Sequence, residues 1–194
     1  STQNDKIHHL KKPKLFNDSN HIFIDKTSIT GLEIFKTNEN KNNPTLFSLL
    51  DQCNTSMGSR LLKEDLRSPY TNKKFLELRL NIVEYLISDS LENDTNQISE
   101  QLKKISDIER LSSRLALRSI RPKEIIELKD SILSVINLSK IWNRIDRTEI
   151  KSLNLIISND TRMTNYIEAA IMNEPATSIN NGHVIQSGFN KELD

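Results

Sequence analysis

The sequence predicts a mainly α-helical fold, a multi-helix bundle with a short β element near each end. Apolar residues recur every three to four positions over most of the chain after residue 44, which is typical of amphipathic helices. Residues that favour helix N-caps precede several of these stretches, and prolines separate them. With only 4 glycines and 5 prolines, the composition also argues against a collagen-like or glycine-rich chain.

Composition excludes several classes of protein. Charged residues make up 27% and hydrophobic residues 36% of the 194 residues, as in a globular domain. The mean hydropathy is −0.52 and no run of about 18 apolar residues occurs, so no membrane span is expected. The formal net charge of +1 gives no overall attraction to nucleic acid. A single cysteine, Cys53, excludes an intrachain disulfide framework.

The N-terminal part predicts a connector followed by a small β element. Residues 1–20 are polar and without periodicity, so we expect an extended linker. His21–Asp25, with its β-branched and aromatic residues, predicts a short strand. Thr27–Phe35 fits either a helical turn or a second strand. A helix then starts after Thr45, with an apolar face at Leu46–Leu50.

Two amphipathic helices are predicted next. Thr55 and Ser56 provide N-cap oxygens for a helix from about Met57 to Arg67, which Ser68-Pro69 ends. Thr71-Asn72 caps the following helix. The residues expected to be apolar contacts are Leu61, Leu62 and Leu66 in the first helix and, on one broad face of the second, Phe75, Leu76, Leu80, Ile82, Val83, Leu86 and Ile87.

The C-terminal half predicts more helices. A polar break at residues 90–96 precedes a helix marked by Ile98, Leu102 and Ile105. Ser106 and Glu109 have the spacing of a capping box, and Ile108, Leu111 and Leu115 would face inward. Pro122 then opens a long helix that runs to about Trp142. The remaining elements are expected to be weaker helices at 149–157 and 161–172 and a short strand within 182–189.

No motif for catalysis or for cofactor binding occurs. The sequence lacks a phosphate-binding P-loop, the common zinc motifs His-Glu-x-x-His and Cys-x-x-Cys, and a Gly-x-Ser-x-Gly nucleophile elbow. We therefore predict no catalytic residue, no cofactor site and no metal site in this chain.

Three arginines are the candidates for contact with DNA. Arg110, Arg114 and Arg118 are spaced to share one helix face, where they could meet phosphates or an acidic partner. The alternative is a solvated face whose arginines pair with Asp107, Glu109 or Glu124, and such faces are the more common case.

A glycine early in a predicted helix also needs a reason. Gly58 costs the helix about 1 kcal/mol relative to alanine, so we expect another segment to approach it closely. Phosphate binding at this helix N-terminus is the alternative.

Five blocks of sequence carry a further pattern. They are Ile24–Ser28 with Leu32-Glu33-Ile34, Thr45–Asp51, Thr55–Leu62, Asp107–Ala116 and Gly182–Asp194. In this order they resemble the core, or lever, domain of MutS-family DNA mismatch repair proteins of the bacterial or organellar type. The resemblance covers about residues 21–194, so it predicts residues 1–20 as the connector and 21–194 as the N-terminal part of the lever domain, ending where the clamp begins.

The resemblance implies structural roles for five residues. Asp25 and Glu33 would shape the first element, Gly58 and Arg60 would make a helix contact, and Glu109 would cap a helix. It implies no catalytic residue, because the mismatch-reading and ATP-binding motifs of the family have no counterpart here. Helices that return after the clamp would close the domain, so we expect an apolar stripe, on the helix from Pro122 to Trp142, to lack its partner.

The function implied is mechanical. A full-length MutS protein is a dimeric ATPase that uses ATP and Mg²⁺, encircles mismatched double-stranded DNA and signals to a MutL-type protein. This segment would transmit movement between clamp and ATPase, inside the cell, in the bacterial cytoplasm or in a eukaryotic organelle or nucleus. The last residues predict a helix that is just beginning, so we expect a fragment. A helical protein–protein interaction scaffold unrelated to DNA repair is the alternative.

Overall fold

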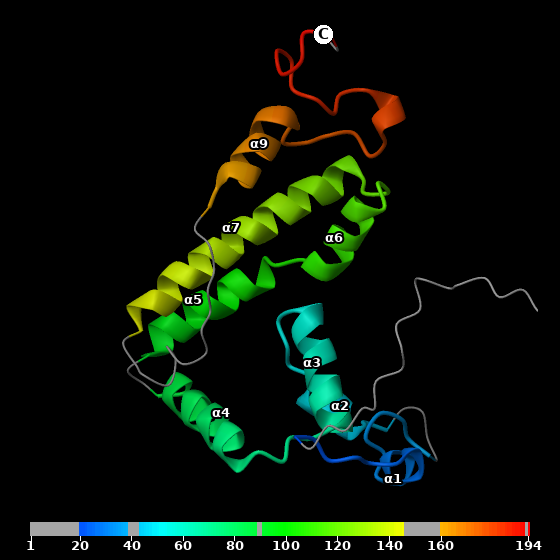
Figure 1. Cartoon of the computed structure of the whole chain (residues 1–194), viewed down its shortest axis with the longest axis vertical. Coiled ribbons are helices and arrows are strands. Elements are labelled where there is room, and N and C mark those ends of the chain that lie inside the picture. Colours follow the sequence, from blue (N-terminus) through cyan, green and yellow to red (C-terminus); the bar gives the residue numbers. More distant parts are fainter. Residues whose placement is uncertain (1–19, 39–42, 89–90, 146–159, 193) are drawn as a thin grey trace, which may run out of the picture.

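The computed structural model describes residues 20–38, 43–88, 91–145, 160–192 and 194, and it is mainly helical (Figure 1). Residues 1–19 of the predicted connector and the predicted helix at 149–157 lie outside the described residues. The elements are α1 (Lys26–Gly31), α2 (Leu46–Leu50), α3 (Ser56–Arg67), α4 (Lys73–Leu86), α5 (Glu92–Lys103), α6 (Ile108–Ala116), α7 (Pro122–Arg144), α9 (Arg162–Ala170) and the 3₁₀ turn η2 (Ile179–Asn181).

Helix α7 is the centre of the molecule. It has 23 residues and is therefore about 34 Å long. As predicted, Pro122 is its first residue, and the Glu124 carboxylate accepts a hydrogen bond of 2.8 Å from the Arg121 amide. Helices α5, α6 and α9 all pack against it, and Figure 1 shows α9 on the opposite side of α7 from α5.

Small polar side chains let the neighbouring segments approach α7 closely. Ser131, Ser134 and Ser139 are all buried, and Ser131 has no exposed surface at all. The Ser131 hydroxyl donates to the Glu127 carbonyl oxygen at 2.7 Å and accepts from the Ser106 amide at 3.0 Å. This bond ties α7 to the link between α5 and α6, and it satisfies a backbone N–H that would otherwise lose its partner.

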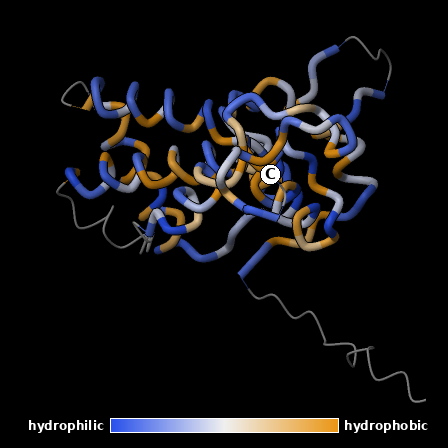
Figure 2. The backbone as a smooth tube through the Cα atoms, turned by 90° about the horizontal axis from the view of Figure 1, so that it is seen from above, coloured by the Kyte–Doolittle hydropathy of each residue, from blue (hydrophilic) through white to orange (hydrophobic). Residues whose placement is uncertain are grey.

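Helix α4 joins the bundle through one face only. Ile82 lies in an apolar cluster with Leu91 and Ile145, and the residues packed around these three are Leu78, Tyr85, Leu86, Ile98 and Trp142. Figure 2 shows how apolar and polar residues alternate along the helices. Because Trp142 and Ile145 belong to this apolar cluster, the cluster fixes α4 at the C-terminal end of α7.

The other face of α4 is an exposed apolar stripe. It consists of Leu76, Leu80, Val83 and Ile87. The prediction that α7 carries the unpartnered stripe is wrong, because α5, α6 and α9 pack against α7 and none of its large hydrophobic residues is exposed. Helix α4 instead packs through Ile82 and its neighbours, which leaves the rest of its broad apolar face to solvent.

Neither predicted β element forms a strand among the described residues. His21 makes a single antiparallel bridge with Tyr70, and Ile171 makes another with Ile185. At the first bridge the Ile22 amide donates to the Pro69 carbonyl at 2.7 Å. Helices capped by Asp25 and Asn72 begin a few residues later, so the two extended segments run side by side too briefly to build a ladder.

The N-terminus of α6 differs from the predicted capping box. Asp107, not Ser106, is the N-cap, and its carboxylate accepts from the Arg110 amide at 3.2 Å. The Ser106 amide is bonded to Ser131, so the helix starts one residue later. The cap predicted for Glu109 is thus wrong.

Other expectations hold in part. Helix α3 begins one residue before the predicted start at Met57 and ends at Arg67 as predicted, and the helix predicted at 161–172 is the shorter α9, Arg162–Ala170. The prediction of a polar break at 90–96 is wrong, since α5 begins at Glu92. Two acidic residues lie in the first turn of α5, where the helix dipole favours negative charge. Leu61 and Leu115 are exposed, because no element that the structure describes covers those faces of α3 and α6.

Gly58 is packed against its own capping loop. A Cβ built there would lie 3.0 Å from the Thr55 hydroxyl oxygen and 3.5 Å from Cys53 Cβ. The segment that approaches Gly58 is therefore the turn between α2 and α3, and not a separate neighbouring element as predicted. The same Thr55 oxygen caps α3 by accepting from the Gly58 amide at 3.0 Å, so any side chain at this position disturbs the cap.

We expect Gly58→Leu to lower the free energy of unfolding by about 1–3 kcal/mol, because overpacking and a displaced cap outweigh the better helix propensity of leucine. Gly31→Leu is the matched control, since a Cβ at Gly31 meets nothing within 4 Å. Urea unfolding of both variants and wild type measures the difference. Equal stability of the two variants would show that the space around Gly58 does not matter.

Candidate functional site

A polar junction joins α3 to the start of α6. The guanidinium of Arg60 donates two hydrogen bonds to the Asp107 carboxylate, at 2.7 and 3.0 Å, and a third to Glu109 Oε2 at 2.7 Å. We call these three residues the Arg60 junction. It connects positions 47 and 49 residues apart in the sequence, and it brings together two of the sequence blocks described above.

Local sequence places the three side chains. Thr55 caps α3, so Arg60 lies in the second turn of that helix. Asp107 caps α6, and Glu109 is in its first turn. The two helix N-termini therefore meet at the junction. Next to it, the Asn54 side-chain amide donates to the Ser99 hydroxyl at 3.1 Å, which attaches the same turn to α5.

The junction fixes geometry more than it adds stability. The side chains of Arg60, Asp107 and Glu109 are 45%, 22% and 75% exposed, so water screens their attraction. The hydrogen bonds from Arg60, followed by the Arg110 amide, hold the pKa of Asp107 well below its usual range. A planar guanidinium that grips one carboxylate at two points sets the relative direction of the two helices, which a lysine could not do.

Asp25 and Glu33 shape the first element. The Asp25 carboxylate caps α1, accepting from the Ser28 amide at 2.9 Å and from the Ser28 hydroxyl at 2.7 Å, and these bonds lower its pKa. Glu33 follows α1 with a positive φ of 50° and accepts from the Asn38 amide at 2.7 Å. Both residues thus hold the turn that leads from α1 toward α2.

The three candidate arginines do not share one helix face. Helix α6 ends at Ala116, and Arg118 lies beyond it with a left-handed φ of 54°. Arg114 forms an ion pair with Glu124, a partner named in the solvated-face alternative. Arg110 and Arg118 are exposed and have no ion pair among the described residues.

No catalytic cluster is found in the part of the chain that the structure describes. No group of three or more potential metal ligands occurs there. Partial burial and the Asp51 carboxylate raise the pKa of the Cys53 thiol, which favours its unreactive protonated form.

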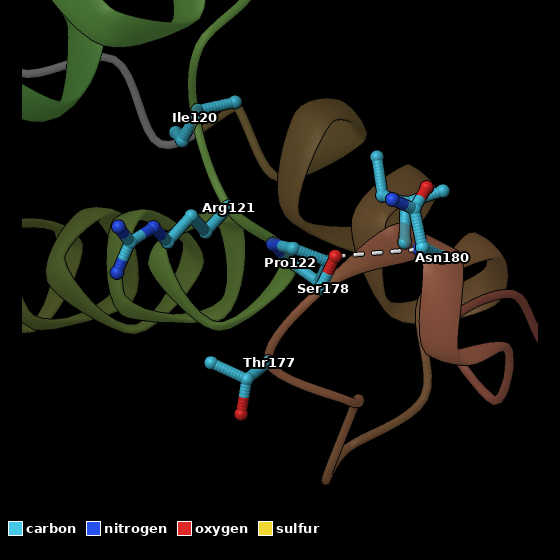
Figure 3. A pocket seen from close by; sticks show the side chains of 7 residues that line it. Ile120, Arg121, Pro122, Thr177, Ser178 and Asn180 are labelled. Carbon is cyan, nitrogen blue, oxygen red and sulfur yellow. Dashed lines mark hydrogen bonds between the residues drawn. The ribbon is translucent and has the colours of Figure 1, made fainter.

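A cavity of about 520 Å³ lies where α7 begins, beside η2 (Figure 3). Ile120, Pro122, Ser178 and Asn180 are among its lining residues, and the Asn180 amide donates to the Ser178 hydroxyl at 3.4 Å. Arg121 is the one charged residue in the lining, and in Figure 3 its side chain extends away from Ser178 and Asn180. No set of polar groups converges there to suggest chemistry.

Sequence reasoning named Arg60 and Glu109 but missed their connection and the central role of Asp107. In the sequence, Asp107 stands out only as the start of the block Asp107–Ala116 and as a possible partner of the nearby arginines. A signal was present, since two carboxylates two residues apart at a helix start make a natural receptor for one guanidinium. Only the fold, however, brings residue 60 to residue 107.

We expect Asp107→Asn to remove an acid-sensitive part of the stability. The lowered pKa means that the carboxylate stabilises the fold above about pH 4, its unfolded value, and that this contribution fades as the pH falls further. Asparagine can still cap the helix, whereas alanine cannot. The free energy of unfolding of Asp107→Ala should therefore be about 1 kcal/mol lower than that of Asp107→Asn, at acid pH as well as at neutral pH.

Urea unfolding between neutral pH and about pH 2 tests this expectation. Glu84→Gln, at an exposed carboxylate on α4 that forms no ion pair among the described residues, controls for the loss of one charge. If the difference between wild type and Asp107→Asn stayed constant over the whole range, the junction would not be the source of the effect.

Comparison with known proteins gives a consistent result. The family model for MutS domain III matches residues 27–192. DNA mismatch repair proteins MutS are similar over the whole chain or 99% of it: 36% identical in Petrotoga mobilis, 33% in Caldanaerobacter subterraneus subsp. tengcongensis and 34% in Clostridioides difficile. The chain spans about a fifth of the length of these relatives, namely 23%, 22% and 20%.

These matches decide between the two classes predicted from the sequence. Nothing in them supports an unrelated scaffold, and all of them point to the resemblance carried by the five sequence blocks. Within the described residues no helix has both the length and the apolar character needed to cross a membrane. The chain belongs to the MutS family, in which it corresponds to domain III.

Proposed function

We propose that this chain is a non-catalytic lever in a DNA mismatch repair protein, coupling the DNA-holding clamp to an ATPase elsewhere in the parent. The observation that supports this best is α7, a rod about 34 Å long that is packed against α5, α6 and α9. Close-packed helices move as rigid bodies, so a displacement at one end of such a rod is carried to the other.

The parent protein would supply what this chain lacks. We propose that it is a dimer that binds mismatched double-stranded DNA, uses ATP with Mg²⁺ and signals to a MutL-type protein. The names of the matched relatives support the repair function. Such a protein works inside the cell, in the bacterial cytoplasm or in a eukaryotic organelle or nucleus. Residues 1–20 would be the connector and 21–194 the N-terminal part of the lever domain up to the clamp.

A kink in α7 should uncouple DNA binding from ATP hydrolysis in the full-length parent protein. Asn137 is an exposed residue in the interior of α7, so Asn137→Pro should kink the helix at a cost of about 3 kcal/mol. In the full-length protein we expect mismatched DNA to lose most of its effect on ATP turnover, while turnover without DNA is kept. The measurement is the ratio of the two ATPase rates.

Asn137→Ala is the matched control and should retain coupling. Because proline could unfold the domain, Asn137→Gly provides a milder softening, about 1 kcal/mol relative to Asn137→Ala, for which a partial loss of coupling is expected. If folded proline and glycine variants couple as well as wild type, α7 does not act as the lever.

For DNA itself, we expect only weak binding by the 194-residue chain, without preference for a mismatch, because its net charge is +1. If Arg110 and Arg118 contact phosphates, replacing both with glutamine should lower the salt-dependence slope by up to about 2. Replacing the paired Arg114 is the control and should change the slope less. A mismatch-selective band shift at physiological salt would contradict the expectation.

A further inference from the structure

A groove unrelated to the Arg60 junction lies between α1 and the C-terminal half of α3. Its volume is about 910 Å³, and its wall is largely apolar, formed by Phe23, Ile24, Ile29 and Phe35. Phe23 is 89% exposed although it is a large aromatic residue. An exposed aromatic side chain at the edge of an apolar groove is typical of a binding surface.

Four cations surround this groove. Lys26 and Lys36 lie on and just after α1, and Lys63 and Arg67 lie on α3. No carboxylate residue is among the lining residues. Over the described ranges none of the four forms an ion pair, in contrast to Arg60, which is held by two acidic residues. The groove therefore combines an apolar wall with four cations that form no ion pair within the described part of the chain.

Aromatic rings hold two of the cations in place. Lys63 Nζ lies 5.6 Å from the ring centre of Phe35 and 5.8 Å from that of Phe47, and the Arg67 guanidinium carbon lies 5.6 Å from Phe35. These cation–π contacts orient the positive groups at the rim. They also occupy ring faces on which a nucleic-acid base would need to stack, which argues against a single-stranded nucleic acid as the ligand.

We propose that this groove binds an acidic peptide segment of a partner protein. An apolar side chain of that segment would enter the groove beside Phe23 and Phe35. Its flanking carboxylates would accept hydrogen bonds from Lys63 and Arg67, with Lys26 and Lys36 adding attraction. Charge complementarity supports this occupant, since cationic side chains grouped on one surface recognise acidic motifs. The inference does not depend on the proposed lever function.

The test is fluorescence anisotropy with the 194-residue chain and a labelled peptide, Glu-Asp-Glu-Leu-Phe-Glu-Asp-Glu. We expect saturable binding with a Kd of about 100 µM or tighter, weakening as salt rises. A peptide with Gly-Ser in place of Leu-Phe should bind at least about tenfold more weakly if the apolar wall contributes.

Variants locate the binding surface. Lys63→Glu with Arg67→Glu should weaken binding of the acidic peptide at least about tenfold. Lys103→Glu with Lys104→Glu, at exposed positions on and beside the end of α5, changes the net charge equally and should have little effect. Phe23→Ala alters an exposed side chain, so the fold should tolerate it while peptide affinity falls.

Three results would overturn the proposal. The first is the absence of saturable binding to the folded chain. The second is an equal loss in both charge-reversal pairs, which would mean attraction by net charge alone. The third is tighter binding of a thymidine oligonucleotide of matched length through Lys63 and Arg67, which would assign the groove to nucleic acid.

Discussion

The rest of the structure depends on the burial of α7. Its side chains meet α5, α6 and α9 on different sides, and these helices have no comparable contact with one another. The hydroxyl of Ser131 shows how closely the elements approach, since it bonds a backbone amide of the α5–α6 link inside the core. A larger apolar residue there would separate α7 from that link and leave the Ser106 amide without its partner.

The N-terminal third is attached differently. Polar groups tie α3 and the turn before it to the rest of the structure, with Arg60 on the α6 cap, Asn54 on Ser99, and Asp65 in an ion pair with Arg79 of α4. Such contacts are directional but add little free energy in water. The molecule thus combines a tightly packed rod with a part whose orientation is set by a few polar contacts, and this division is compatible with the lever function proposed above.

Much of this fold could be predicted from the sequence, because caps and apolar periodicity are local signals. Thr45, Thr55 and Asn72 each cap the helix expected after them, and Pro122 opens the long one. The errors came from tertiary contacts. Ser106 lost its capping role because its amide is bonded to Ser131, and the Asp107 carboxylate serves both α6 and Arg60. The expected strands lacked partners of sufficient length, and the side on which α4 packs was decided by Ile82 and its cluster.

The long separation in sequence between Arg60 and Asp107 has a consequence for the order of folding. Helices α5, α6 and α7 follow one another directly, so they can pair after closing short loops, whereas the junction must close a loop of 47 residues. Its few exposed hydrogen bonds offset little of the entropy lost on closing this loop, so we expect the junction to form late in folding. We therefore expect a partly open state in which α1 to α3 have detached while the α5–α7 pair persists, a low-energy excursion of the native ensemble and not a global unfolding.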